Sequence, residues 1–250
     1  MVEKSIKNNK IKKGQFLVSI TTTKGADWEA RIKEIDKLKI KKLALFVTCV
    51  NEKERKKLYQ ALEKTSLKEI PFCHIRSDMP FCELDYLTKR WQTKVFNLHT
   101  RKEFAFKYAY DNSKYKDKIY IENVYFGLPE DEVKRFAGIC LDFSHLENDR
   151  LIRPEVFKES LKMLEKYKIG CNHISGIFAT AQEIIEHSGV IRYDKHFFTN
   201  FKDFNYLKKY PLKYFSKYCA LEVENPLKDQ LKAIDYIVKQ IKNQKSKIKD

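Results

Sequence analysis

The sequence lacks any run of about 18 consecutive apolar residues, the length that a helix needs to cross a bilayer. Its first residues, MVEKSIKNNKIKK, are charged, and no apolar segment of the kind found in secretion signals follows them. We therefore expect neither a membrane span nor a signal peptide, and no membrane partner.

Paired cysteine motifs are also missing. The chain has 6 cysteines, with no CxxC pair and no even ladder of the kind that marks secreted disulfide frameworks. Four of them sit inside apolar runs, where cysteine behaves as a small hydrophobe. This pattern predicts reduced thiols and a cytoplasmic protein.

No Gly-, Ser- or Pro-rich linker divides the chain, which has only 7 glycines and 6 prolines in 250 residues. Hydrophobic residues make up 43% of it, enough for a substantial core. We expect one domain over residues 1–250, with a core at about 16–242 between basic N- and C-terminal tails. We also expect a monomer.

Acidic residues are outnumbered, 34 against 50 lysines and arginines, which gives a formal net charge of +16. Such a charge attracts a polyanion such as nucleic acid. Because lysine is spread over nearly every expected helix, an ordinary solvated surface is the alternative interpretation.

Short apolar runs recur with charged segments between them. Segments 28–38, 52–65, 154–167 and 226–242 place apolar residues three and four apart, as amphipathic helices do. Two other connections hold one short expected helix each, at 85–91 and 104–112. The apolar runs lie at 16–20, 42–50, 70–75, 94–99, 118–124, 138–143, 168–174 and 218–224. This alternation predicts an α/β fold, a single (β/α)₈ TIM barrel with shortened connections.

Imidazoles and carboxylates gather at the ends of these runs, where a barrel of this kind assembles its active site. They are His74, His99, Glu122, Asp142, His145, His173, Glu222 and Glu224, with Asp194 and His196 in the loop after the seventh run. Only His187 among the 6 histidines lies outside this set.

A mixture of imidazole nitrogen and carboxylate oxygen suits Zn²⁺, Mn²⁺ or Fe²⁺ better than Ca²⁺ or Mg²⁺. So many ligands exceed the needs of one ion, and we expect two or three, with Glu122 and Glu224 able to bridge them. Glu222 and Glu224 share the parity of an inward-facing strand residue.

The motifs at these ends resemble, in chain order, those of the endonuclease IV group of AP endonucleases (AP endonuclease family 2), which are xylose-isomerase-like TIM barrels. The similar stretches are NLH ending at His99, IENV with Glu122, ICLDFSH with Asp142 and His145, YDKH with Asp194 and His196, and LEVENP with Glu224. His74 and His173 fall at the third- and seventh-strand ligand positions of that group. We choose Glu224 over Glu222 because Asn225-Pro226 stands where the group has Thr-Pro.

The resemblance implies a metal-dependent hydrolase that cleaves double-stranded DNA 5′ to abasic sites, as in base-excision repair. It implies a trinuclear metal site, usually of zinc. We expect two or three Zn²⁺ ions, with Mn²⁺ as a second candidate, and a catalytic part for Glu122 and Glu224. The implied metal ligands are His74, His99, Glu122, Asp142, His145, His173, Asp194, His196 and Glu224.

Basic and aromatic residues adjoin these ligands in the sequence. The candidates for contacts with DNA phosphates are Arg76, Arg101, Lys102, Arg192 and Lys195. Tyr125, Phe126, Phe143, Phe197 and Phe198 are candidates for stacking on DNA or, equally, for loop packing.

The chain also departs from that group. The first-strand G-x-H-x-S is Val18-Ser-Ile-Thr-Thr here, and the tyrosine three residues after the third-strand histidine is Ser77. Two alternatives therefore stay open. One is a sugar or sugar-phosphate isomerase or epimerase, which in this fold generally uses a Glu, Asp, His, Glu quartet and one metal. The other is a noncatalytic nucleic-acid-binding barrel.

Overall fold

The structure is a computed structural model that describes residues 11–185 and 189–247. His187 and most of the expected basic N-terminal tail lie outside the described residues.

Strands of the described residues form one parallel sheet in the order β1-β13-β8-β7-β6-β5-β4-β3-β2. They are β1 (Phe16–Leu17), β2 (Ser19–Thr21), β3 (Lys42–Phe46), β4 (Glu69–His74), β5 (Val95–Leu98), β6 (Ile119–Glu122), β7 (Ile139–Asp142), β8 (Ile169–Ile174) and β13 (Cys219–Leu221). The first apolar run is split at Val18: β1 pairs with β13, whereas β2 pairs with β3. The run thereby joins the two ends of the sheet, and the predicted (β/α)₈ barrel is confirmed.

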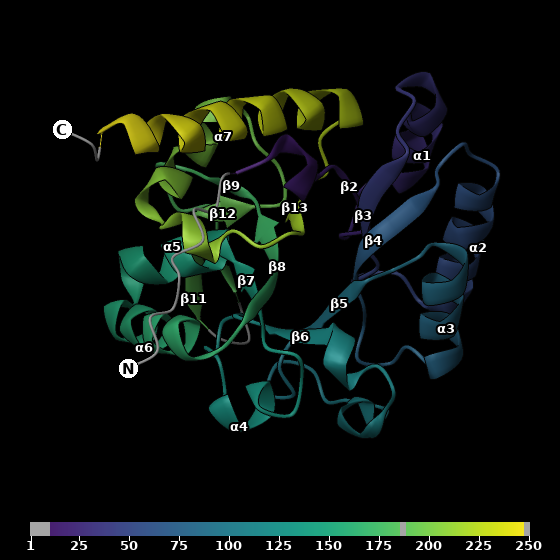
Figure 1. The fold of residues 1–250 in the computed structure, drawn as a ribbon, viewed down its shortest axis with the longest axis horizontal. Helices are drawn as coiled ribbons and strands as arrows, with labels where there is room; N and C mark the ends of the chain where they lie inside the picture. The colour runs from purple at the N-terminus through teal and green to yellow at the C-terminus, as the bar shows by residue number, and fades with distance from the viewer. Residues whose placement is uncertain (1–10, 186–188, 248–250) are drawn as a thin grey trace, which may run out of the picture.

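Helices flank the sheet on several sides. Figure 1 shows α1 (Trp28–Lys37), α2 (Glu52–Glu63) and α3 (Phe81–Arg90) on one side, and α5 (Phe143–Ile152) and α6 (Pro154–Lys166) on another. The boundary signals are local ones. Asn51 forms a capping box with Glu54 at the start of α2, and Pro154 occupies the first turn of α6.

The last helix is longer than predicted. α7 begins at Leu227 and continues to Lys247, past the expected end of the core at residue 242. It lies across one end of the molecule in Figure 1. Most of the expected C-terminal tail is therefore helical.

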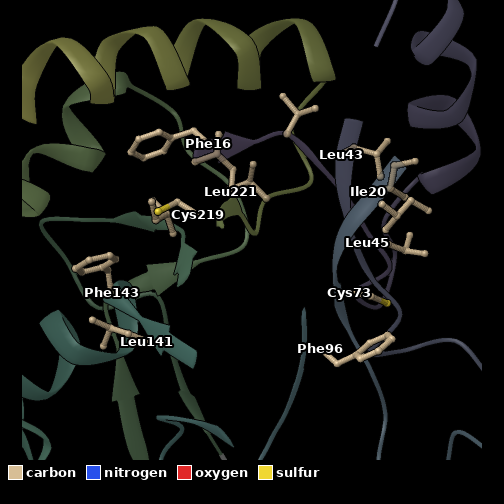
Figure 2. Packing of buried hydrophobic residues seen from close by; sticks show 14 of the residues in the cluster. Phe16, Ile20, Leu43, Leu45, Cys73, Phe96, Leu141, Phe143, Cys219 and Leu221 are labelled. Atoms are coloured by element: carbon tan, nitrogen blue, oxygen red, sulfur yellow. The ribbon is translucent and has the colours of Figure 1, made fainter. Parts of the chain in front are cut away.

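Alternating strand residues build two apolar layers. One set of side chains packs between the sheet and the helices, and Figure 2 shows part of it, including Phe96, Leu141 and Leu221. The other set fills the barrel: Leu17, Ala44, Phe46, Phe72, Val95, Tyr120, Cys140, Cys171 and Ala220. Residues two apart in a strand point to the same face of the sheet. A polar residue two positions after an inner apolar residue therefore also faces inward.

The connection between β5 and β6 differs from the prediction. Residues 104–112 do not form an α-helix; the segment ends in the single 3₁₀ turn η2 (Tyr110–Asn112), and η3 (Lys116–Lys118) follows. Its aromatic residues, Phe104, Phe106, Tyr108 and Tyr110, recur every second residue rather than at helical spacing. Phe106 and Tyr108 pack against Tyr110, at 5.7 and 6.2 Å between ring centroids.

The connection before β7 and the one after β8 carry unequal amounts of structure. Before it stands the single turn α4 (Glu130–Val133). The chain between β8 and β13 makes the excursion β9 (Gly176–Ile177), β10 (Glu183–Ile185), β11 (Val190–Arg192), β12 (Asp194–Lys195), η4 (Phe201–Lys209) and η5 (Leu212–Tyr214). β12 pairs antiparallel with β9, and a side chain at Gly176 would collide with the Phe197 carbonyl, so glycine permits this close pairing.

All six cysteines are free of disulfides, as predicted, and Cys73, Cys140, Cys171 and Cys219 are buried. Among the described residues, no helix has the length and apolar character that a membrane span requires.

Candidate metal centre

Glu122, the last residue of β6, lies at the centre of the strand-end cluster. Its Oε2 atom is 3.7 Å from His74 Nε2 and 3.8 Å from His99 Nε2. Its Oε1 atom is 3.4 Å from His173 Nδ1. One carboxylate therefore presents a different oxygen to each of two histidine groups.

Two sets of side chains form around it, each with ligand atoms within 4.8 Å of one another. The first set is His74, His99 and Glu122. The second is Glu122, Asp142, His173 and Glu222, in which His173 Nδ1 is 3.1 Å from Glu222 Oε2 and 3.8 Å from Asp142 Oδ2. Each set can hold a divalent cation, and Glu122 is the residue that both contain. The two sets adjoin, because His74 of the first also forms a group with His173 and Glu222 of the second.

A further combination joins Glu122 and His173 to Cys140. Burial and the neighbouring Cys171 raise the pKa of the Cys140 thiol well above its usual value. Cys140 also belongs to the apolar layer that fills the barrel, so it lies where that layer meets the site.

Burial and charge act in opposite directions on these groups. Burial lowers the pKa of His74 to about 3 and also lowers that of His99, so both imidazoles are neutral. Burial alone would raise the pKa of Glu122 and Glu222, yet His173 and other histidines hold both below the usual value. Glu122 and Glu222 in turn raise the pKa of His173 well above its usual value. The site thus combines imidazole nitrogens with ionised carboxylates, which is the donor set of a transition-metal or zinc site.

Several ligand atoms have no hydrogen-bond partner although they are buried. They are Nδ1 of His74, His99 and His173 and Oδ2 of Asp142. Buried polar atoms are nearly always satisfied, and unsatisfied ones are costly. A cation would satisfy His173 and Asp142 at once, so the residues fit the metal site that the sequence predicted.

Asp142 and His145 hold their places through the start of α5. The Oδ1 atom of Asp142 caps that helix by accepting hydrogen bonds from Ser144 N and His145 N, at 2.7 and 2.9 Å. His145 Nδ1 lies 3.0 Å from the Asn123 carbonyl oxygen, to which it can donate. His145 therefore reaches the site from the first turn of a helix, not from a loop.

Asn97 is a site residue that the sequence reasoning missed. It faces inward from β5, two residues before His99, and its Nδ2 atom donates to Glu122 Oε2 at 2.7 Å. Its Oδ1 atom is 3.3 Å from His173 Nε2. The shared parity with His99 was the available signal, but an amide carries no charge that marks it in a sequence.

Asp194 and His196 are not brought into a third complete set among the described residues. Asp194 Oδ2 lies 3.8 Å from His145 Nε2, while His196 Nε2 lies 3.9 Å from Glu222 Oε1. Arg192 donates hydrogen bonds to both carboxylate oxygens of Asp194 and, from Nη1, to the Tyr125 hydroxyl at 2.7 Å. Burial would raise the pKa of Asp194, but Arg192 holds it below the usual value.

Glu224, chosen from the sequence, lies outside both sets, and Glu222 takes the place in the second. The carboxylate of Glu224 accepts a hydrogen bond from the Thr23 hydroxyl instead, and its backbone N donates to the His196 carbonyl at 2.7 Å. The physical reason is that β13 ends at Leu221. The alternation of inward- and outward-facing side chains therefore does not continue as far as Glu224. The geometry therefore favours Glu222 over the predicted Glu224 as the ligand from this strand end.

Most of the predicted basic residues already have protein partners. Arg76 pairs with Asp78 and donates to the Thr48 carbonyl, and Arg101 pairs with Asp111. Arg192 is buried against Asp194. Lys102 lies 4.8 Å from the Phe126 ring at an exposed position, and Lys195 is half-buried.

The aromatic candidates divide by exposure. Phe143 and Phe198 are buried, and Phe143 stacks on Phe215 at 4.5 Å, so loop packing explains both. Phe126 and Phe197 are exposed, and Tyr125 packs 5.4 Å from His145.

Apolar rings form the floor of the cluster. Phe72 stacks on His173 at 5.4 Å, and Phe46 meets the same imidazole edge-on at 4.9 Å. Beside His74 and His99 a cavity of about 80 Å³ opens, lined also by Thr48, Ile75, Arg76, Ser77, Leu98 and Phe104.

Comparison with protein-family models gives no match, and comparison with curated proteins gives none either.

Proposed function

We propose that this chain is a metal-dependent hydrolase that cleaves the DNA phosphodiester 5′ to abasic sites. The observation that supports the proposal is Glu122, whose two oxygens face two adjoining histidine-containing ligand sets. Two ions a few Å apart are a recurrent arrangement for phosphodiester hydrolysis. Zinc is the ion that this donor set favours, with manganese as the second candidate.

Divalent ions in such a site lower the pKa of a bound water and offset the negative charge of the phosphate. The chain's own residues supply the rest. Glu122 fixes the distance between the two sets, and Phe46 and Phe72 exclude water from below. The carboxylates of Asp142 and Glu222 keep the second set anionic, which favours an ion of charge two there.

The third ion implied by the resemblance, with Asp194 and His196 as its ligands, stays a prediction, and so does His145 as a ligand of the deeper ions. His145 and Asp194 face each other, and His196 is directed toward Glu222. Binding to double-stranded DNA and a role in repair also stay predictions that rest on the resemblance and on the net charge of +16.

One observation favours the isomerase alternative. The second set is a Glu, Asp, His, Glu quartet, Glu122, Asp142, His173 and Glu222, which is the kind of set expected for a one-metal sugar isomerase. The pair His74 and His99 distinguishes the candidates, because a one-metal enzyme has no use for a second histidine set on the other oxygen of Glu122.

The test is incubation of the zinc- or manganese-loaded protein with a duplex that carries one abasic site. We expect a single nick 5′ to that site, abolished by a chelator and restored by zinc. A duplex with an intact base at the same position is the matched control and should stay whole.

Metal content provides the second arm. At least two zinc ions per chain are expected. If the abasic duplex stays intact under zinc and manganese while a ketose is converted by protein that holds one ion, the nuclease proposal is wrong.

A further inference from the structure

We propose that Asn97 is a positioning residue that aims both Glu122 and His173 at the two ions; the inference rests on the proposed function. Asn97 is fully buried on β5 and contacts both side chains. Glu122 belongs to both ligand sets and His173 to the second. One amide thus touches the carboxylate shared by the two ion positions and the imidazole of one of them.

The direction of each hydrogen bond follows from the chemistry of the partners. An ionised carboxylate only accepts, so the group of Asn97 that faces Glu122 Oε2 at 2.7 Å is the NH₂ group. The amide oxygen must then face His173, and it lies 3.3 Å from Nε2. Since this oxygen only accepts, His173 Nε2 carries a hydrogen.

This assignment determines which nitrogen of His173 can bind a cation. With a hydrogen held on Nε2, Nδ1 is the only ring nitrogen of His173 that can offer a lone pair to a cation. Nδ1 is the atom that faces Glu122, Glu222 and Asp142, and it has no hydrogen-bond partner. Asn97 therefore selects the tautomer that directs the lone pair into the second set.

The same amide restricts Glu122. Its NH₂ group donates to Oε2, the oxygen that faces His74 and His99, and so fixes the rotation of the carboxylate. The other oxygen, Oε1, is left directed at His173. Partners behind metal ligands commonly change metal affinity by ten- to a hundredfold when they are removed.

The first experiment compares zinc affinity of Asn97→Leu with the native chain, by competition with a chromophoric chelator. Leucine has a similar shape and neither hydrogen bond, so we expect affinity to fall about 10- to 100-fold, with both ions still bound at saturation. Asn172→Leu is the matched control. Asn172 is an equally buried asparagine on β8, but it hydrogen-bonds the backbone of Leu141, Tyr214 and Ser216, away from the cluster.

Equal zinc affinity in Asn97→Leu and the native chain would overturn the inference and leave the proposed function standing. An equal fall in the zinc affinity of Asn172→Leu would also overturn the inference, because it would show that any loss of packing weakens zinc binding. Fewer than two zinc ions in the native chain would count against the proposed function itself.

A second measurement needs no variant and covers a failure of Asn97→Leu to fold. In the zinc-loaded native protein, the ring of His173 should show a slowly exchanging Nε2–H proton by nitrogen-15 NMR. A proton on Nδ1, with the metal on Nε2, would overturn the assignment of the tautomer.

Discussion

Asp142 performs two functions through two different oxygens. Oδ1 caps α5, and Oδ2 faces His173 without a hydrogen-bond partner. The helix cap fixes the rotation of the carboxylate, which therefore presents Oδ2 to the site before any cation binds. The three-residue spacing to His145 is the spacing of a cap and the third residue of its helix.

Substitutions at Asp142 should separate these functions. In chelator, Asp142→Ala should unfold about 1 kcal/mol more easily than Asp142→Asn, because asparagine is as good a helix cap as aspartate. Zinc affinity should fall strongly in both, since neither provides an anionic ligand. Urea unfolding in chelator and zinc titration check the two effects, and native-like zinc affinity in Asp142→Asn would contradict the role of Oδ2.

Glu222 and Glu224 provide a second test of this kind. We expect Glu222→Gln to lose one zinc ion and about 100-fold or more in nicking rate, roughly 3 kcal/mol of transition-state stabilisation. Glu224→Gln should keep both ions, because its carboxylate bonds Thr23 outside the two sets. Metal analysis and initial rates measure this, and the reverse result would restore the original choice between the two glutamates.

The sequence allowed most ligands of the two sets to be predicted, for a physical reason. His74, Glu122 and Asp142 each end an apolar run, so charge and position coincide in the sequence. Glu222 was passed over because Asn225-Pro226 stands where the resembled group has Thr-Pro, and the sequence does not show that β13 ends at Leu221. Asn97 was missed because a neutral amide inside a strand has no distinguishing pattern.

At the scale of elements, Glu147 links α5 to the 3₁₀ segment η4. Its carboxylate is buried and accepts hydrogen bonds from Arg150 on its own helix and from Lys209 and Tyr210 at the end of η4. Burial alone would raise the pKa of Glu147, but these donors hold it below its ordinary value of 4.5. The link helps to fix α5, and with it His145, against the excursion that carries Asp194.

Glu147→Gln should therefore lower the free energy of unfolding by about 1–2 kcal/mol at pH 7. Because the folded pKa is below the unfolded one, this stabilisation is complete above the ordinary pKa and is lost as pH falls through the folded pKa. The difference between the two proteins should shrink below about pH 4.5. Urea unfolding between pH 3 and 7 measures it, with Glu155→Gln at an exposed pair as the control.

The connection at 104–112 shows where element prediction failed. A short segment with Phe104, Phe106 and Tyr110 is apolar enough for a helix, yet its period of two suits an extended chain whose rings pack on the rim. The longer amphipathic segments were predicted correctly because three or more turns repeat the same spacing.

For the whole molecule, alternating apolar and amphipathic segments were sufficient to predict the barrel. The way in which the two ends of the sheet are joined was not foreseeable. It depends on the split of the first apolar run into β1 and β2, which pair with different neighbours. Nothing in the residues FLVSI marks Val18 as the point of division.

Zinc should stabilise the whole barrel, because six of its strands carry cluster residues at or beside their carboxyl ends. At free zinc 100 times the dissociation constant, one site adds about 2.7 kcal/mol, which corresponds to a rise in Tm of about 5–11 °C. Thermal unfolding in zinc and in chelator checks this. Magnesium should have a smaller effect because imidazole is a poor ligand for it, and an equal rise with magnesium would argue against the histidine sets.

The aromatic floor of the cluster also controls access. Phe46 and Phe72 close the barrel beneath His173, and below them lies a dry layer that includes Cys140 and Cys171. Among the described residues of the cluster, His99 is partly exposed at the rim, while His173 is fully buried. We therefore expect an ion beside His173 to exchange with solvent more slowly than an ion beside His99.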